Sequence, residues 1–207
     1  MSAPDGKAAA ASPLAPEEIA QAIATADQEP NNSVMQRKLG LGLYQYARAQ
    51  TDAPYLSDVA RLLIRAQTAN PRDTEVIFAL GNTQFVLARR STPAQFAVVR
   101  RTYQQLLVLQ PDNADAHLAL GLAYHFGQPS QNERALAELQ RAYAINPRQD
   151  NILQALAILH LAMKQRDKAT QFVNQLAGLD PQHPALSSLR AQIAGRATDT
   201  PPEVLKH

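Results

Sequence analysis

The sequence predicts an all-α fold, a solenoid of antiparallel helix pairs, and three observations support this prediction. A proline recurs at intervals of 41, 40, 36 and 34 residues, and periods of this size are typical of stacked helical repeats. Each interval contains a Leu-Gly or Leu-Ala pair a few residues after the proline. No segment alternates polar and apolar residues for long enough to predict a β-strand. The recurring prolines are Pro30, Pro71, Pro111, Pro147 and Pro181.

The segment after Pro111 shows how a helix is inferred from its spacing. Its apolar residues cover more than the single stripe of an amphipathic helix, so we expect this helix to be buried on more than one side. These residues are Leu118, Leu120, Leu122, Tyr124 and Phe126, with Ala116 and Ala119 between them.

Capping and proline signals set the expected helix ends. Ser130 and Glu133 have the spacing of a capping box at the start of the next helix. Pro147 ends that helix, because the residue before a proline is biased away from helical geometry. Thr92 is expected to cap a helix that has a proline at its first position, and His183 precedes a proline in the same way.

These signals predict ten helices and a simple domain organisation. We expect a flexible linker over residues 1–14, about four repeats with an N-terminal and a C-terminal capping helix over 15–195, and a disordered tail over 196–207. The expected helices are residues 15–28, 32–49, 55–69, 73–89, 93–109, 113–126, 131–145, 149–163, 166–179 and 184–194.

Composition limits the function classes. The chain has 207 residues, of which 45% are hydrophobic and 18% charged, as in ordinary globular proteins. No apolar run approaches the roughly 18 residues of a membrane-spanning helix, so we expect no membrane insertion within this chain. A formal charge of +2 is too small to predict nucleic-acid binding. The sequence has no cysteine, so disulfides do not indicate the compartment. The alternatives are the periplasm, for a soluble domain cut from a membrane-anchored protein, and the cytoplasm.

Eight positions of the third repeat match a known family pattern. They are His117, Leu120, Gly121 and Tyr124 in the first helix, then Ala135, Leu139, Ala142 and Pro147 in the second. This resembles the tetratricopeptide repeat family, whose pattern is Trp-x-x-Leu-Gly-x-x-Tyr followed by Ala-x-x-x-Phe-x-x-Ala-x-x-x-x-Pro. The match recurs in register four times over residues 17–194. The resemblance implies a right-handed superhelix of helix pairs, in which small residues allow close helix approach and large ones fill the gaps.

Two departures separate these repeats from the family pattern. The family repeat is about 34 residues long, and only the interval from Pro147 to Pro181 has this length. We place the extra residues of the other three repeats between their paired helices, around Gln50–Ala53, Arg89–Pro93 and Gly127–Gln131. The large aromatic residue at the fourth position of the first helix is missing throughout.

The resemblance implies that the first helix of each pair lines a concave groove. Carried over by register, the groove positions are mostly apolar and aromatic, which suits an amphipathic helix or a hydrophobic peptide. The alternative is that the protein's own segments cover these side chains. Asn82 favours a ligand, because an amide among apolar neighbours is costly without a partner. The predicted groove residues are Arg37, Leu41, Tyr44, Phe78, Asn82, Phe85, Leu118, Leu122, His125 and Ile158.

No other chemistry is indicated, so we expect no enzyme activity, no metal and no cofactor. The sequence has no phosphate-binding loop, nucleophile elbow or paired carboxylates. No histidine has metal-ligand spacing. His117 and His160 fall on packing positions, whereas His125 is predicted on the concave face.

Charged residues give two weaker signals. A clamp for a peptide's terminal carboxylate is disfavoured, because Arg37 and Lys38 are the cations near its positions and Asp115 would repel the carboxylate. The arginine pairs Arg89-Arg90 and Arg100-Arg101, with Arg61 and Arg65 nearby in sequence, could form a basic rim. The alternative is that they solvate the convex face.

Two functions remain. The first is a non-catalytic module that binds a helix or hydrophobic peptide of a partner protein in the concave groove. Within the family, the chain resembles bacterial assembly factors for c-type cytochromes in its early helix over 16–26, its linker-like start and its stretched repeats. That resemblance implies a periplasmic domain that holds the C-terminal helix of an apocytochrome. The second is a structural scaffold that self-associates or joins a larger complex. Partner identity and oligomeric state stay open.

Overall fold

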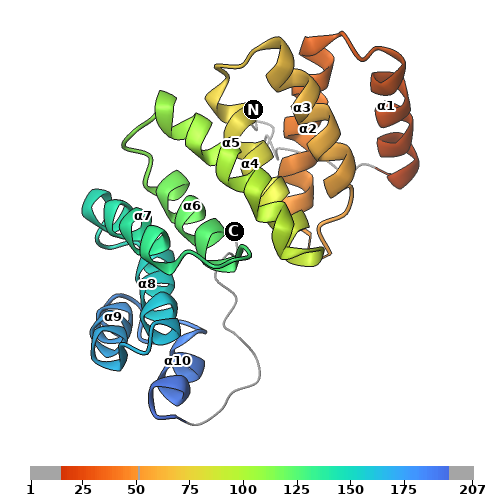
Figure 1. Cartoon of the computed structure of the whole chain (residues 1–207). Coiled ribbons are helices and arrows are strands. Elements are labelled where there is room, and N and C mark those ends of the chain that lie inside the picture. The colour runs from red at the N-terminus through yellow and green to blue at the C-terminus, as the bar shows by residue number, and fades with distance from the viewer. Residues whose placement is uncertain (1–14, 51, 196–207) are drawn as a thin grey trace, which may run out of the picture.

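The structure is a computed structural model that describes residues 15–50 and 52–195 (Figure 1). The described residues form ten α-helices, one short 3-10 helix and no strand. The predicted linker and tail lie outside the described residues. The elements are α1 (Pro16–Gln28), α2 (Ser33–Arg48), α3 (Leu56–Ala69), α4 (Thr74–Arg90), η1 (Pro93–Gln95), α5 (Phe96–Leu109), α6 (Ala114–Phe126), α7 (Asn132–Ile145), α8 (Asp150–Ala162), α9 (Arg166–Leu179) and α10 (Leu186–Ile193).

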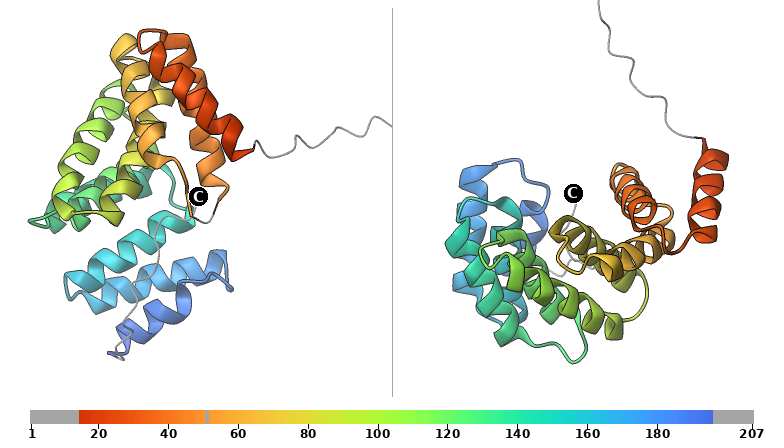
Figure 2. Two further views of the ribbon diagram at one scale, coloured as in Figure 1. Left: turned by 90° about the vertical axis from the view of Figure 1, so that its right-hand side faces the viewer. Right: turned by 90° about the horizontal axis from the view of Figure 1, so that it is seen from above.

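The helices form a stack of pairs. The pairs are α2–α3, α4–α5, α6–α7 and α8–α9, with α1 before the first pair and α10 after the last (Figures 1 and 2). The second helix of each pair contacts the first helix of the next pair, and the first helices α2, α4, α6 and α8 contact one another in sequence. The predicted all-α solenoid of helix pairs is confirmed, and each of the ten expected helices is present.

The turns between repeats cap the following helix in a repeated way. Asn32, Asp73 and Asn113 each lie two residues after a recurring proline. A side-chain oxygen of each accepts a hydrogen bond from the backbone N–H three residues later, at 3.1, 3.1 and 2.9 Å. This satisfies a backbone donor at the start of α2, α4 and α6. Gln149 has the equivalent place before α8 and makes no such bond.

Two predicted caps are wrong and a third is confirmed in position. Ser130 and Glu133 do not form a capping box, because α7 begins at Asn132 and leaves Ser130 before its N-cap. His183 is not the cap of the last helix, because α10 begins at Leu186 with Ala185 as its N-cap. Thr92 does precede a helix with a proline at its first position, but this helix is η1, and Thr92 makes no side-chain cap bond.

α6 lies at the centre of the core. Every residue from Ala116 to Tyr124 is buried, which confirms the prediction that this helix is buried on more than one side. It contacts α5 and α7 on the side of the second helices, and α4 and α8 along the row of first helices. A helix surrounded in this way is apolar around most of its circumference.

Glycines on the first helices allow the pairs to close. A Cβ added to Gly81 would lie 2.9 Å from the ring of Tyr103, and one added to Gly121 would lie 2.9 Å from Leu139 Cγ. These separations are shorter than two carbon atoms tolerate in a packed interior. By contrast, Gly42 lies in the interior of α2 with no such atom within 4 Å of the added Cβ.

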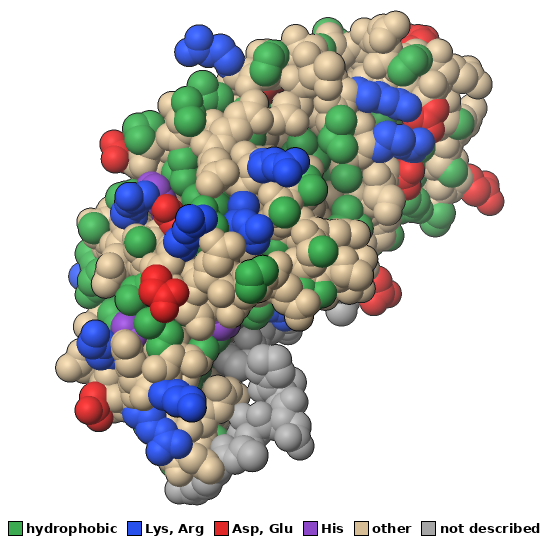
Figure 3. All heavy atoms as spheres, viewed as in Figure 1, with side chains coloured by type: hydrophobic (Ala, Val, Ile, Leu, Met, Phe, Trp, Pro, Cys, Tyr) green, Lys and Arg blue, Asp and Glu red, His purple; other side chains and the backbone are tan. Residues whose placement is uncertain are grey.

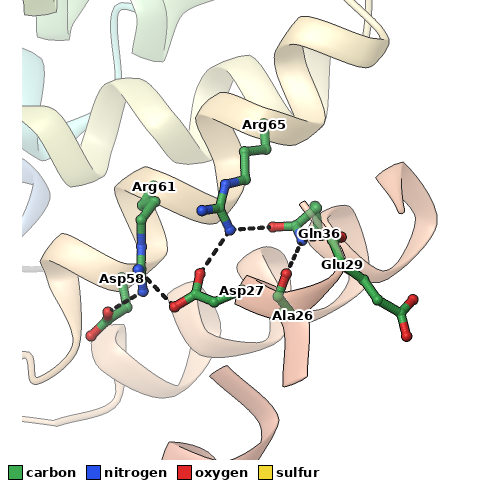
Figure 4. Close-up of polar contacts among 7 residues, drawn as sticks. All are labelled: Ala26, Asp27, Glu29, Gln36, Asp58, Arg61 and Arg65. Carbon is green, nitrogen blue, oxygen red and sulfur yellow. Dashed lines mark hydrogen bonds and ion pairs between the residues drawn. The ribbon is translucent and has the colours of Figure 1, made fainter. Parts of the chain in front are cut away.

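An ion-pair cluster holds α1 against the first repeat (Figure 4). The Asp27 carboxylate accepts hydrogen bonds from Arg61 at 2.8 Å and from Arg65 at 2.7 Å. The buried Gln36 side chain donates to the carbonyl oxygen of Ala26 at 2.6 Å, near the end of α1. The hydrogen bond from Arg65 lowers the pKa of Asp27, desolvation opposes this, and the charges of both arginines add to the lowering. The cluster therefore ties α1 to α2 and α3.

The close approach at Gly81 predicts opposite effects for two Gly→Ala changes. Gly81→Ala should lower the free energy of unfolding by about 1–2 kcal/mol, because overpacking against Tyr103 costs more than the helix propensity of alanine returns. Gly42→Ala should raise it by about 0.5–1 kcal/mol, because that site is open. Urea denaturation followed by circular dichroism measures both. Shifts of the midpoint in the same direction would contradict the packing described.

The lowered pKa of Asp27 predicts that acid loosens α1. A carboxylate whose pKa is lowered by folding contributes stability above its ordinary pKa of 3.8, and this is lost as the pH falls through the lowered value. Hydrogen exchange of the α1 amides should therefore show less protection below about pH 4 than at neutral pH, relative to α6. Asp27→Asn should reduce α1 protection already at neutral pH, while Asp112→Asn on an exposed turn should not. Unchanged α1 protection in Asp27→Asn would disprove the role of the ion pairs.

Candidate partner-binding surface

The predicted groove residues lie on the row of first helices, α2, α4, α6 and α8 (Figure 2). Half of them are buried and half reach the surface. The buried residues are Tyr44, Asn82, Phe85, Leu118 and Leu122. Arg37 is exposed, and the half-buried residues are Leu41, Phe78, His125 and Ile158. The half-buried side chains are distributed one to each first helix, and three of them are apolar.

Asn82 has partners within the protein. Its Nδ2 donates to the hydroxyl oxygen of Tyr44 at 2.7 Å, and its Oδ1 accepts from the hydroxyl of Tyr103 at 2.6 Å. Burial raises the pKa of Tyr103 well above its ordinary value and also raises that of Tyr44, so both phenols stay protonated. This chain of hydrogen bonds links α2, α4 and α5. Asn82 therefore needs no ligand, which corrects the expectation from the sequence.

Arg37 is engaged by carboxylates of the next repeat. Its Nε donates to Asp73 at 2.7 Å, and its Nη2 donates to Glu75. Desolvation would raise the pKa of Asp73, but the hydrogen bond from Arg37 and those from the N-cap backbone lower it overall. A ligand carboxylate would have to compete with both of these acids for Arg37. This arrangement agrees with the expectation that the chain has no clamp for a terminal carboxylate.

Phe85 belongs to an aromatic cluster of α4, α5 and α6. Its ring lies edge-on to Phe96 and Phe126, with centroids 5.3 and 6.3 Å apart. Leu118 and Leu122 belong to the same hydrophobic core. In this conformation the three buried side chains make internal contacts, so a guest would not reach them. The open groove expected at these positions is corrected: they are core.

The histidines also have partners in the protein. His117 and His160 are buried, and their Nδ1 atoms lie 2.7 Å from Glu138 and Gln165 oxygens respectively. The structural roles predicted for these two are confirmed. Burial is the main reason why the pKa of His160 is lowered. His125 remains half-buried near the end of α6 and stays a candidate contact.

The described residues lack both the side-chain groups of a metal site and the helices of a membrane span. They contain no group of three or more His, Cys, Asp or Glu side chains that could hold a metal ion. Within the same part of the chain, none of the helices has the length and apolar character that crossing a bilayer requires.

The arginines of the basic rim mostly have local partners. Arg65 pairs with Asp27, and the guanidinium of Arg89 lies 4.5 Å from the centre of the Phe126 ring. Arg100 donates to a backbone carbonyl of α6 at 3.2 Å. Figure 3 shows basic, acidic and apolar side chains mixed over one face, with several basic ones above α5 and α7. A continuous basic rim is not formed there.

Two sequence models of one repeat family match the chain. One, described as tetratricopeptide repeat, matches residues 128–193, and the other, described as TPR repeat, matches residues 100–125. The matched segments cover most of α5 and α6 and all of α7 to α10. Residues 100–125 and 128–193 therefore carry tetratricopeptide repeats, as the sequence pattern predicts. Such arrays present extended surfaces for binding other proteins.

Solved tetratricopeptide-like structures have the same architecture. A crystal structure of MamA is 18% identical, with a TM-score of 0.62, and the match covers 80% of this chain and 88% of that one. MamA from Desulfovibrio magneticus RS-1 is 15% identical, with a TM-score of 0.65 and coverages of 81% and 86%. The TPR protein TTC0263 from Thermus thermophilus is 20% identical, with a TM-score of 0.62 and coverages of 86% and 88%. Comparison with curated protein sequences finds no match. At these identities the likeness supports the fold.

The buried position of Asn82 predicts that its replacement is costly. Asn82→Leu should lower the free energy of unfolding by about 1–3 kcal/mol, because the buried Tyr103 hydroxyl loses its acceptor. Tyr103→Phe in the Asn82→Leu background should recover part of this loss, since it removes the unsatisfied hydroxyl. Urea denaturation of the two single variants and the double variant measures the coupling. If the two changes are additive, Tyr103 does not depend on Asn82.

Proposed function

We propose that this protein is a non-catalytic interaction module that holds an apolar helix or peptide of a partner protein along its first helices. The observation that supports this most directly is the set of half-buried side chains on these helices. Leu41, Phe78, His125 and Ile158 each reach the surface from a different repeat. A partner lying across the row would contact one such residue in each repeat.

The buried groove residues form the core on which the half-buried side chains pack. Phe78 and Ile158 rest on a core that includes Phe85 and Leu122, and Leu41 packs against the core of the first repeat. A half-buried side chain held by a packed core loses little further freedom on binding, which favours affinity. The binding surface is therefore narrower than the predicted groove but is supported by close-packed side chains.

The narrower hypothesis is that the partner is the C-terminal helix of an apocytochrome c. Two features behind that resemblance can be located in the structure. α1 precedes the first repeat, and the connection from α4 to α5 contains η1, where the second repeat is longer than the family repeat. Both features concern the arrangement of helices and not a binding surface, so the apocytochrome partner and the periplasmic compartment stay predictions. A structural scaffold that binds further copies of this chain is the alternative.

Peptide binding by surface variants tests the proposal. Wild-type protein should bind synthetic C-terminal apocytochrome peptides in calorimetric titrations. Phe78→Glu and Ile158→Glu should each weaken binding by about tenfold or more, since each introduces a charge into an apolar contact. Val98→Glu, at an exposed site on the second helix α5, is the matched control and should bind as wild type does.

Two further measurements separate the outcomes. Circular dichroism should show helicity retained in Phe78→Glu and lost in Leu122→Glu, because Leu122 is buried in the core. Light scattering over a concentration series should show a monomer. Flat titrations against every apocytochrome tail would exclude the cytochrome hypothesis. Flat titrations together with a concentration-dependent oligomer would favour the scaffold instead.

A further inference from the structure

The second helices of neighbouring repeats are joined at one recurring position. Gln67 of α3 donates a hydrogen bond to Gln105 of α5 at 2.8 Å, and Tyr143 of α7 donates to Gln175 of α9 at 3.0 Å. In both pairs the donor lies 4 residues before the proline that ends its repeat, and the acceptor lies 6 residues before the next such proline. One register position therefore forms a lateral bridge between α3 and α5 and between α7 and α9.

Between α5 and α7 the same register position holds Leu107 and Arg141. Leucine has no hydrogen-bonding group, and Arg141 donates at 2.9 Å to Glu138 of its own helix. In the described part of the chain, no side-chain hydrogen bond joins α5 directly to α7. A hollow of about 510 Å³ lies here, and both Leu107 and Arg141 line it. The hollow thus coincides with the one missing lateral bridge among the three.

One end of the hollow is apolar. Leu107 and Val108 line its α5 side, and the side chain of Leu120 from α6 lines it between the two helices. Val108 is 83% exposed, which is unusual for a branched apolar side chain. Leu120 is already buried. Covering Leu107 and Val108 would remove apolar surface from water, which favours binding of an apolar side chain.

One arginine lines the other side of the hollow, and two more lie on α5 and α7 outside its lining. Arg141 borders it and is 63% exposed. Arg100 and Arg134 approach the ring of Tyr124 from α5 and α7, at 5.5 and 5.9 Å from its centre. The carboxylate on the lining is Glu138, which already accepts hydrogen bonds from its neighbours. Basic side chains also lie above α5 and α7 in Figure 3.

We propose that this hollow between α5 and α7 is a second docking site, which binds an acidic segment of a partner protein through an apolar side chain and flanking carboxylates. The apolar side chain covers Leu107 and Val108 and rests against the buried Leu120. The carboxylates pair with the arginines, whose planar guanidinium groups bind carboxylates through two parallel hydrogen bonds. Arg134 and Arg141 are two helical turns apart, roughly 10 Å, which matches acidic residues two turns apart on a partner helix. The site is separate from the first-helix surface of the proposed function.

The lateral bridge between α3 and α5 shows which residues would close the hollow. Leu107→Gln with Arg141→Gln reproduces the pair Gln67 and Gln105 at the equivalent position, so the variant should fold with a lateral bridge where the hollow was. The matched control is Val98→Gln with Arg101→Gln, which likewise replaces one apolar residue and one arginine by glutamine, at exposed positions of α5 outside the lining. Circular dichroism and thermal unfolding check that both variants keep the fold.

The probe is a displayed library of random dodecapeptides, selected on the wild-type protein and counter-selected on the Leu107→Gln, Arg141→Gln variant. The selection should enrich peptides that combine aspartate or glutamate with leucine, isoleucine or phenylalanine. Fluorescence anisotropy with the labelled peptides should give binding that is at least about tenfold weaker for the closed variant and unchanged for the control variant. Raising the salt concentration should weaken the binding further.

Three results would overturn the proposal. One is that no peptide is enriched against the closed variant. Another is that the enriched peptides are basic or bind the closed variant as tightly as the wild type. The third is that a single-stranded oligonucleotide binds wild type but not the closed variant, which would assign the arginines to phosphate. None of these results bears on Phe78 and Ile158, so the first-helix surface is tested independently.

Discussion

The close approach of the two helices within each pair determines most of this structure. A small residue of the first helix faces a large side chain of the second, as Gly81 faces Tyr103 and Gly121 faces Leu139. Because the backbones come so close, the first helices sink into the stack and lose most of their surface. α6 is the extreme case, with every residue from Ala116 to Tyr124 buried.

Because of this burial, the first helices and the second helices offer different surfaces to a partner. The first helices retain a few half-buried side chains on a packed core, whereas the second helices keep broad exposed faces. On the second helices, the lateral bridges decide where the surface is closed. Gln67 and Gln105 close it between the first two pairs, and Tyr143 and Gln175 close it between the last two. At Leu107 and Arg141 this position forms no bridge, and a hollow lies there.

The helices could be predicted from the sequence because their signals are local. Recurring prolines, small residues and apolar spacing predict all ten helices. The Asn and Asp residues two places after three of the prolines carry a further signal, because their caps place the starts of α2, α4 and α6 one residue later than the spacing predicts. The groove was harder to predict. Repeat register gives the direction of a side chain such as Asn82, but its burial depends on how closely Tyr44 and Tyr103 approach from other helices. The burial of such a side chain depends on contacts between residues far apart in the sequence, which the spacing of residues along the chain does not show.

The position of the hollow has a physical reason in the nearest-neighbour character of repeat arrays. Each pair is stabilised mainly by its own packing and by its contacts with adjacent pairs, so one interface can lose a polar bridge only if its apolar contacts compensate. The α5–α7 interface is backed by α6, whose buried side chains join the cores of both repeats. A lateral hydrogen bond contributes about 1 kcal/mol, which is less than one well-packed leucine provides. The array can therefore omit the bridge next to its most buried helix, and that is where apolar and basic side chains remain uncovered.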